Sequence, residues 1–473
     1  MAFPDLATAP QVVDQAGLAT TPAVTPRPRQ PAARARRGVS PGVVLTLVWS
    51  GAALVLAQWW LTTSSVTGAA GWLTEAGRIT GLLAGYGAAL LVLLMARIPA
   101  IERGAGADRL ARWHAMGGRY TVSLALAHAV LITLGYAAAT NSALLAQIGS
   151  FLTSYPDLLT ATAALALFVA LAATSARAAR RRLPYEAWHL MHLSAYLAVY
   201  LGFGHQIANG AQFVADPVAR WAWTSLYAAA GLAALWYRFA TPLVRSWAHD
   251  LRVARVVREG PDAVSVLVSG RHLDRLGAES GQFFRWRFLT APLVWSANPY
   301  SLSAPPTPGL LRFTAKDLGA HSRALAALRP GTRVIAEGPY GAMTAARRRR
   351  EPVLLVGGGV GITPMRALLE SLPARQGAIT VVYRASSDRD VILRRELDLL
   401  AAARGARVHY VIGRRRDLGG DPLGGDALAR LVPDLRRHEV FVCGPDGLRE
   451  AVEGACRRAR VPRRRVHSED FAF

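Results

Sequence analysis

Five of the eleven histidines in this sequence fall within long apolar segments: His114, His128, His189, His192 and His205. An imidazole in a hydrocarbon environment is costly, so its presence there usually marks a functional site. His114 and His128 are fourteen residues apart, and His192 and His205 are thirteen residues apart. On two helices that rise about 1.5 Å per residue, these four side chains would form facing pairs at two levels, roughly 20 Å apart. Two such pairs predict axial ligation of two stacked b-type haems.

The thirteen-residue spacing is harder to reconcile with a regular helix. Fourteen residues return to within about 40° of the same helix face, whereas thirteen miss that face by about 140°. A π-bulge or local unwinding near Gly202 and Gly204 would correct the orientation of His205; otherwise the two haems approach this segment from different sides. The alternative for the whole set is interhelical hydrogen bonding. His189 has two open interpretations, a partner for a haem propionate or a packing residue.

These histidines lie on the third and fifth of six apolar segments, each close to the about 20 residues with which a helix crosses a bilayer. A large buried helical core would show similar segments, but six of them with short connections favour a multi-pass protein of the cell membrane. Arginines gather before the first segment and after the second and fourth, which predicts that both termini are cytoplasmic. The segments are 41–63, 78–97, 113–139, 155–175, 188–208 and 221–240.

Composition narrows the classes of protein further. The 473 residues are 52% hydrophobic and carry a formal net charge of +24, which argues against a single ordinary domain and against a disordered chain. Two cysteines exclude a disulfide scaffold and a Cys-rich zinc or iron–sulfur site. Much of the arginine lies in the tail and in short loops. The positive charge therefore indicates topology in a lipid bilayer, not binding to nucleic acid.

From about residue 248 the pattern changes to short alternating stretches, which predict an antiparallel β-barrel. After Arg347–Arg350, buried strand patterns alternate with helices, as in an α/β unit with a parallel sheet. We expect a disordered tail (1–40), a six-span membrane helical bundle (41–247), a β-barrel domain (248–346) and an α/β nucleotide-binding domain (347–473). The predicted strands are Arg252–Val257, Ala263–Val268, Gln282–Phe288, Val353–Val356, Ile379–Tyr383, Val408–Ile412 and Val440–Val442.

A glycine-rich turn follows the first buried strand of the α/β unit. Glycines let the backbone approach a pyrophosphate, and the N-terminus of the following helix favours an anion. The turn departs from the dinucleotide-binding fingerprint, because Ile362 stands where the last glycine belongs. Four further motifs surround it in the chain. They are Asn298-Pro299-Tyr300-Ser301-Leu302-Ser303, Glu337-Gly338-Pro339-Tyr340-Gly341, Cys443-Gly444-Pro445 and Ser468-Glu469-Asp470-Phe471-Ala472-Phe473.

In this order the motifs resemble the ferredoxin–NADP reductase fold. With the apolar segments and the paired histidines, the chain from about 41 to 473 resembles the NADPH oxidase/ferric reductase superfamily. That resemblance implies an FAD site, although the family usually has Arg or His at the position of Asn298. The residues implied for FAD are Asn298, Pro299, Tyr300, Ser301, Lys316, and the turn Gly319-Ala320-His321-Ser322, with Phe471 over the flavin ring and Phe473 as its alternative.

The same resemblance implies a site for a nicotinamide nucleotide. Arg414, Arg415 and Arg416, with Arg384, resemble the place where NADP-specific members bind the 2′-phosphate, which favours NADPH over NADH. A solvated basic loop is the alternative, and Cys443 also fits a small buried residue after a strand. The residues implied for the nucleotide are Gly357, Gly358, Gly359, Gly361, Thr363, Pro364, Cys443, Gly444 and Pro445.

The resemblance implies a transmembrane flavocytochrome. Electrons would pass from cytoplasmic NADPH through FAD to the inner haem (His114, His192), and then through the outer haem (His128, His205) to an acceptor outside. Dioxygen, giving superoxide, and a ferric chelate are both open as acceptors. A membrane subunit that supplies electrons to a dedicated protein partner and a haem-free, membrane-anchored flavin reductase are the alternative functions.

Overall fold

A computed structural model describes residues 38–176, 185–341, 343–418 and 420–469. Most of the predicted tail, the arginine-rich loop at 177–184, and both Phe471 and Phe473 lie outside these residues.

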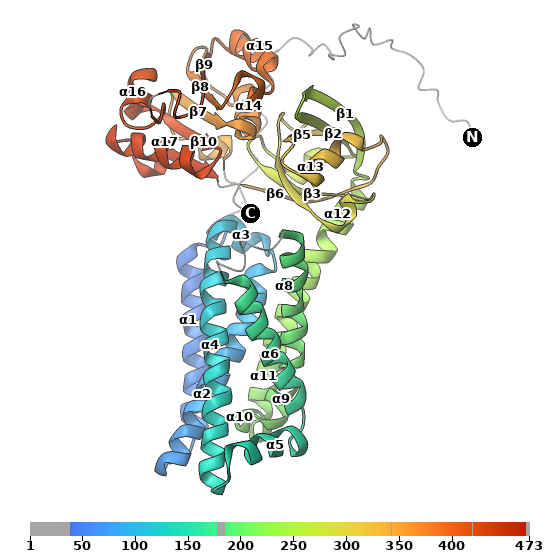
Figure 1. Cartoon of the computed structure of the whole chain (residues 1–473), viewed down its shortest axis with the longest axis vertical. Coiled ribbons are helices and arrows are strands. Elements are labelled where there is room, and N and C mark those ends of the chain that lie inside the picture. Colours follow the sequence, from blue (N-terminus) through green and yellow to red (C-terminus); the bar gives the residue numbers. More distant parts are fainter. Residues whose placement is uncertain (1–37, 177–184, 342, 419, 470–473) are drawn as a thin grey trace, which may run out of the picture. The chain divides into compact units, whose positions relative to one another are not determined.

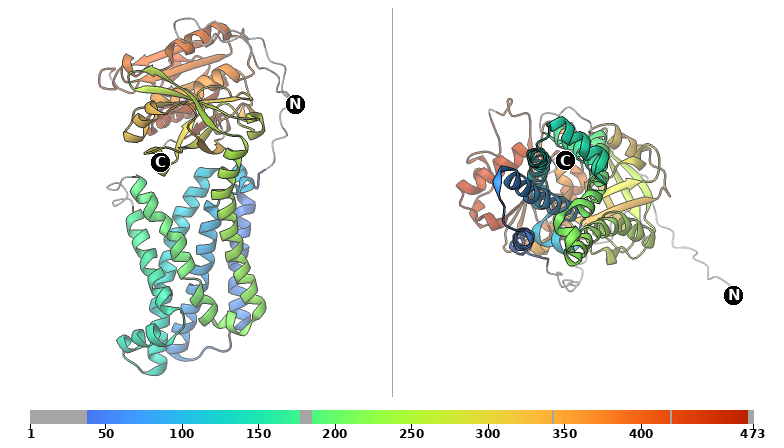
Figure 2. Two further views of the ribbon diagram at one scale, coloured as in Figure 1. Left: turned by 90° about the vertical axis from the view of Figure 1, so that its right-hand side faces the viewer. Right: turned by 90° about the horizontal axis from the view of Figure 1, so that it is seen from below.

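The first half of the described chain is helical, and its long helices run side by side in both side-on views (Figures 1 and 2). Ser40 begins the first of them, because its side chain accepts a hydrogen bond from the Val43 amide and a proline follows at the first helical position. The long helices are α1 (Pro41–Thr62), α2 (Gly68–Met95), α4 (Ala107–Thr140), α6 (Leu158–Ser175), α8 (Tyr185–Leu201) and α11 (Pro217–Ala233). Shorter helices are α3 (Pro99–Ala105), α5 (Leu144–Ser154), α9 (Gly204–Asn209), α10 (Ala211–Ala215) and α12 (Thr241–Ala248), with a π-helix at Ala234–Ala240.

Four helices in the described part of the chain are long and apolar enough to cross a membrane: Pro41–Thr62, Gly68–Met95, Arg109–Thr140 and Leu158–Ser175. They overlap the first four predicted segments. The second of them begins at Gly68, nearly three helical turns before the predicted start at 78. Glu75 and Arg78 neutralise each other inside the helix, which allows it to include both. The helices over the fifth and sixth predicted segments have 17 residues each, and these two spans stay a prediction.

The three strands predicted between residues 248 and 346 are confirmed, and they belong to two antiparallel sheets. In the third strand, Phe284, Trp286 and Phe288 alternate with arginines and are fully buried, so one face of that sheet lines a core. The sheet orders are β1-β2-β5 and β4-β3-β6. The bounds are β1 (Arg252–Gly260), β2 (Ala263–Ser269), β3 (Phe283–Phe288), β4 (Asn298–Ser301), β5 (Leu310–Lys316) and β6 (Val334–Tyr340), with α13 (Ala320–Ala324) between the last two.

The last part of the described chain is a five-stranded parallel sheet of order β11-β10-β7-β8-β9. The strand β7 is buried along its whole length, as expected for a parallel strand with helices on both faces. This confirms the predicted α/β unit. The strands are β7 (Val353–Gly358), β8 (Ile379–Ala385), β9 (Arg407–Ile412), β10 (Glu439–Cys443) and β11 (Val466–Glu469); the helices are α14 (Ile362–Ser371), α15 (Arg394–Arg404), α16 (Ala427–Leu431) and α17 (Asp446–Arg458).

Candidate functional site

The four predicted ligand histidines meet in two pairs. The ring centres of His114 and His192 are 6.0 Å apart, and those of His128 and His205 are 6.3 Å apart. A metal–imidazole bond is about 2 Å long and the ring centre lies about 1 Å behind the nitrogen, so two imidazoles on one metal have ring centres roughly 6 Å apart. Both pairs therefore have the separation that a bis-imidazole haem requires.

On α4, the backbone of α2 fixes the orientation of both imidazoles. His114 Nδ1 lies 3.2 Å from the Leu91 carbonyl oxygen, and His128 Nδ1 lies 2.8 Å from the Gly77 carbonyl oxygen. A ring whose Nδ1–H donates to a carbonyl keeps its Nε2 lone pair for a metal. By contrast, the Nδ1 atom of His192 is buried and has no hydrogen-bond partner among the described residues.

The helix that carries His192 ends before it reaches His205. The helix α8 stops at Leu201, and His205 lies on the separate short helix α9, which begins at Gly204. This interruption is the local unwinding that the thirteen-residue spacing requires. It allows His205 to face His128, although a continuous helix would turn it away.

A cavity of about 370 Å³ adjoins the His128–His205 pair. Small residues make the room: a Cβ on Gly81 would lie 2.5 Å from His128 Nδ1, and one on Gly85 would lie 2.8 Å from Gln206 Oε1. At the other pair, Trp188 stacks on His192 with ring centres 4.9 Å apart. The ring centre of His189 lies 6.5 Å from that of the neighbouring Trp188. The role of His189 stays a prediction.

The residues predicted to bind FAD form β4 and the turn that leads into α13. Tyr300 stacks on Phe313 with ring centres 4.9 Å apart, and its hydroxyl lies 3.2 Å from His321 Nδ1. Burial raises the pKa of Tyr300 to about 12, against the opposing effect of a hydrogen bond with Asn298, so the phenol stays protonated and can donate. Ser301 Oγ is buried and has no hydrogen-bond partner among the described residues. A ligand oxygen or nitrogen at this strand would satisfy it.

Two other residues in this predicted FAD set already have partners. The ammonium of Lys316 forms an ion pair with Asp390, and this contact lowers the pKa of the Asp390 carboxyl below its usual range. The Ser322 hydroxyl accepts a hydrogen bond from the Leu318 amide at 2.8 Å and donates to the Gly319 carbonyl at 3.0 Å. Both residues shape the loop around α13, and their contacts to FAD phosphates stay a prediction.

The glycine-rich turn and the Cys443-Gly444-Pro445 turn lie against each other at the carboxyl ends of β7 and β10. Cys443 is in register with Gly357. A Cβ on Gly361 would lie 2.2 Å from the Cys443 carbonyl oxygen, and one on Gly444 would lie 3.2 Å from Gly358 Cα. The helix α14 begins directly after this turn, so its first amides face the open end of the sheet. The geometry is that of a phosphate cradle at a strand-to-helix turn.

Three other residues in the predicted nucleotide set support the turn. Gly359 has φ of +54°, a backbone conformation that side-chain-bearing residues rarely adopt. The Thr363 hydroxyl donates to the Val360 carbonyl at 2.9 Å, and Pro364 is buried in the first turn of α14. These contacts hold the turn in one conformation before any nucleotide arrives.

Both cysteines of the chain are buried thiols. Burial, with a smaller effect from Glu469, raises the pKa of Cys443 well above its ordinary value, and burial raises the pKa of Cys456 to about 12. Because the thiolate is the reactive form, we expect neither thiol to react with iodoacetamide at pH 8 in the native protein, and both to react in denaturant. Mass spectrometry of the alkylated peptides measures this; rapid native labelling of Cys443 would show it to be a reactive thiol.

Sequence reasoning did not assign a role to Glu75, although a carboxylate inside an apolar helix is itself a signal. Glu75 is buried, forms an ion pair with Arg78 and accepts a hydrogen bond of 2.8 Å from Trp59 Nε1. Gln212, which is also buried, gave no signal in the sequence because glutamine is common in short loops and helices.

Comparison with known proteins agrees with both halves of the chain. A family described as the ferric reductase like transmembrane component matches residues 80–203, and the oxidoreductase NAD-binding domain matches residues 355–454. The chain is 34% identical to ferredoxin–NADP reductase B of Sorangium cellulosum over 215 residues, which are 41% of this chain and 85% of the relative. It is 25% identical to NADH-cytochrome b5 reductase 1 of Pyricularia oryzae, over 48% of this chain and 76% of the relative. Among solved structures, the FAD/NAD-binding domain of nitric oxide dioxygenase from Vibrio cholerae is similar at 22% identity and a TM-score of 0.39, over 46% of this chain and 96% of that one.

These findings define the class of protein. The chain is a membrane oxidoreductase in which a ferric reductase-like helical region precedes a reductase module that binds FAD and a nicotinamide nucleotide. This arrangement matches the fused architecture of ferric reductases and NADPH oxidases, and the reductase module belongs to the ferredoxin–NADP reductase family.

Proposed function

We propose that this protein carries electrons across a membrane, from NADPH on the cytoplasmic side through FAD and two b-type haems to an acceptor on the other side. The observation that carries the proposal is the pair of facing imidazole sets, with ring centres 6.0 and 6.3 Å apart. When bound, the flavin converts the hydride of the nicotinamide into single electrons, and the haems carry these through the membrane.

The chain's own residues hold and orient these groups. His114 and His192 would ligate the inner haem, and His128 and His205 the outer one, with the Leu91 and Gly77 carbonyls fixing two of the rings. The buried Ser301 hydroxyl and the Tyr300 phenol would bind FAD, and the first amides of α14 would bind the nucleotide phosphates. The remaining predicted residues, including Phe471 over the flavin ring, are assigned the same roles by resemblance.

The proposal includes six spans, both termini in the cytoplasm, and domain limits at 41–247, 248–346 and 347–473. It also includes closure of the two antiparallel sheets into a barrel. Isolated bridges between Arg252 and Arg333 and between Leu302 and Phe313, which join strands of different sheets or their flanks, support that closure.

We propose NADPH as the preferred nucleotide, because Arg414 has a charge that is available for a 2′-phosphate. Arg415 pairs with Asp421 at 2.9 Å and Arg416 contacts Asp417 at 3.4 Å, whereas Arg414 makes no ion pair with the described residues. Arg384 donates to the Val411 carbonyl at 3.1 Å and would assist from the neighbouring strand.

We expect Arg414→Ala to lower kcat/KM for NADPH by about 10- to 100-fold, since a hydrogen bond to a charged group contributes about 1.5–3 kcal/mol. The rate with NADH should not change. Steady-state reduction of FAD with each nucleotide measures this, and Arg375→Ala, at an exposed arginine outside this set, is the matched control. An equal loss of kcat/KM with NADPH and NADH would contradict the proposal that Arg414 binds the 2′-phosphate.

A visible absorption spectrum of the purified full chain tests the proposed function as a whole. About two reduced b-type haems per chain are expected, followed by NADPH-driven reduction of dioxygen or a ferric chelate in parallel assays. A flavin spectrum without haem would instead identify a membrane-anchored flavin reductase. If NADPH reduces the haems but neither acceptor reoxidises them, the protein is a membrane subunit that supplies electrons to a protein partner.

A further inference from the structure

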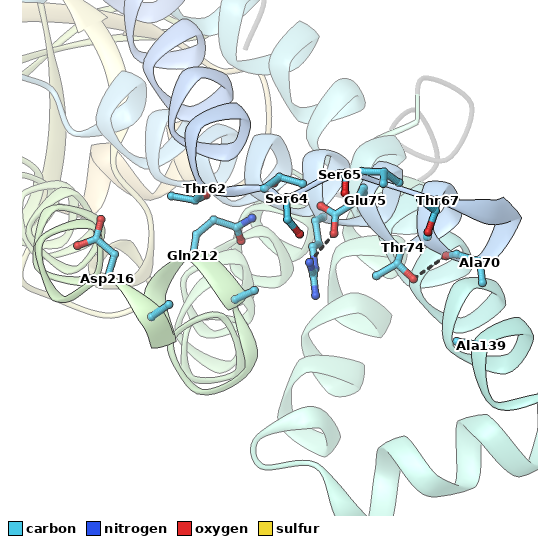
Figure 3. Close-up of a pocket in the computed structure, with 16 residues that line it drawn as sticks. Thr62, Ser64, Ser65, Thr67, Ala70, Thr74, Glu75, Ala139, Gln212 and Asp216 are labelled. Carbon is cyan, nitrogen blue, oxygen red and sulfur yellow. Dashed lines mark hydrogen bonds and ion pairs between the residues drawn. The ribbon is translucent and has the colours of Figure 1, made fainter.

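A polar cavity of about 580 Å³ lies where the connection between α1 and α2 faces α10. Figure 3 shows Thr62, Ser64, Glu75 and Gln212 gathered around it. Sites for small molecules commonly have about 300–1,000 Å³, whereas a single water takes about 30 Å³. This cavity therefore has the size of a binding site for a molecule considerably larger than dioxygen.

The cavity adjoins the one at the His128–His205 pair. Arg78, Ala211 and Gln212 line both of them. These three residues therefore lie between a molecule in the polar cavity and the cavity at the proposed outer haem position. No other residue is shared by the two linings in the part of the chain that the structure describes.

Gln212 points to a ligand. It is only 6% exposed, and its carboxamide makes no hydrogen bond with the described residues. Because Gln212 lines the cavity, its carboxamide offers two donors and an acceptor to a molecule bound there. The hydroxyls of Ser64, Ser65 and Thr67 on the opposite wall are also without hydrogen bonds to the described chain, and they are solvent-exposed.

The charges of the lining select against anions. Arg78 is the one cation among the described lining residues, and Glu75 neutralises it in an ion pair that Trp59 supports. Asp216 adds a second carboxylate, which caps α11 by accepting hydrogen bonds from the Val218 and Ala219 amides. The cavity as a whole therefore carries a net negative charge.

We propose that this cavity binds the terminal electron acceptor, with Gln212, which lines both cavities, as a hydrogen-bonding contact, and that the acceptor is a small molecule or metal complex without net negative charge. The inference rests on the proposed function and names its substrate class. The acceptor takes one electron at a time, and two acceptor molecules are reduced for each NADPH oxidised. Anionic ferric chelates are poor substrates of such a site.

Two redox-stable probes of similar size and opposite charge test the site without electron flow. Hexaamminecobalt(III) is a trication whose ligands donate hydrogen bonds, and hexacyanocobaltate(III) is a trianion. Equilibrium dialysis of the full-length protein in detergent, with cobalt measured in each compartment, gives both affinities. The trication is expected to bind one site per chain more tightly than the trianion.

Two variants locate that site. Asp216→Asn, which retains a helix cap, is expected to weaken trication binding by about tenfold at low ionic strength, the effect of one unit charge on a triply charged ion. Asp157→Asn, at a carboxylate that does not line the cavity, should leave the affinity unchanged. Gln212→Leu removes the carboxamide and is expected to weaken binding of the trication and to slow NADPH-driven reduction of hexaammineruthenium(III).

Equal affinities for the two ions, or trication binding that neither Asp216→Asn nor Gln212→Leu weakens, would overturn the proposed site. If the proposed electron-transfer function is wrong, NADPH will not reduce the haems. That result would not change the affinities measured by dialysis. An acceptor preference for ferricyanide over hexaammineruthenium(III), with both added to the outer face of sealed vesicles, would overturn the charge selectivity.

Discussion

His128→Ala is expected to reduce the haem content from two to one per chain and to lower acceptor reduction by about 100-fold or more. Even changes to groups behind a metal ligand commonly cost about 10- to 100-fold, and this change removes the ligand itself. Reduction of FAD by NADPH should continue at the rate of the unchanged protein, because His128 lies on α4 and has no part in the FAD or nucleotide set. Stopped-flow spectra follow flavin and haem in the same experiment.

His205→Ala should have the same effect, since its ring centre is 6.3 Å from that of His128. His272→Asn is the matched control, at an exposed histidine whose φ of +53° suits asparagine. Adding free imidazole to the alanine variants should restore part of the haem signal, which a purely structural histidine would not show. Full transmembrane acceptor reduction in both variants would refute the ligand assignment.

Gly361→Ala is expected to abolish most NADPH-driven flavin reduction. The new Cβ would lie 2.2 Å from the Cys443 carbonyl oxygen and 2.9 Å from the Gly444 amide nitrogen, and both are backbone atoms that cannot swing aside. The two turns that form the nucleotide cradle must then separate, which costs about 1–3 kcal/mol in comparable overpacked sites. The displaced turn no longer presents the amides of α14 to the phosphates.

Dithionite separates this effect from general damage, because it should still reduce the FAD and haems of the Gly361→Ala protein. Gly309→Ala provides the control, at a glycine of the reductase module with nothing within 4 Å of the added Cβ. The FAD content and the melting temperature check that the module is folded. A wild-type rate of flavin reduction in Gly361→Ala would mean that the nucleotide binds elsewhere.

The sequence predicted the strands with a clear apolar pattern, either alternating or continuous. In β3, arginines alternate with Phe284, Trp286 and Phe288, and in β7 every residue is buried. Such patterns have one low-energy solution, with the apolar side chains against a core. The two histidine pairs were also predictable, because an imidazole within an apolar segment is rare enough to be informative.

The parts that sequence reasoning missed depend on which side chains pair and on where helices end. Glu75 and Arg78 look like the end of a membrane span, yet their ion pair lets α2 continue from Gly68 through both. Arg414 could not be distinguished from Arg415 and Arg416 until Asp421 and Asp417 were seen to pair with the latter two. The orientation of His205 depends on the ends of two helices, and helix ends are the least predictable feature of a sequence.

The interruption at Gly202 and Phe203 places the two proposed ligands of this segment, His192 and His205, on separate helices, α8 and α9. We expect the turn from Gly202 to Gly204 to tolerate the insertion or deletion of a residue. An insertion or deletion inside α8 would instead rotate His192 by about 100° per residue. The ring at the far level can thus be adjusted without disturbing the near one. A scaffold with this property could suit different electron acceptors by altering only the residues beyond this turn.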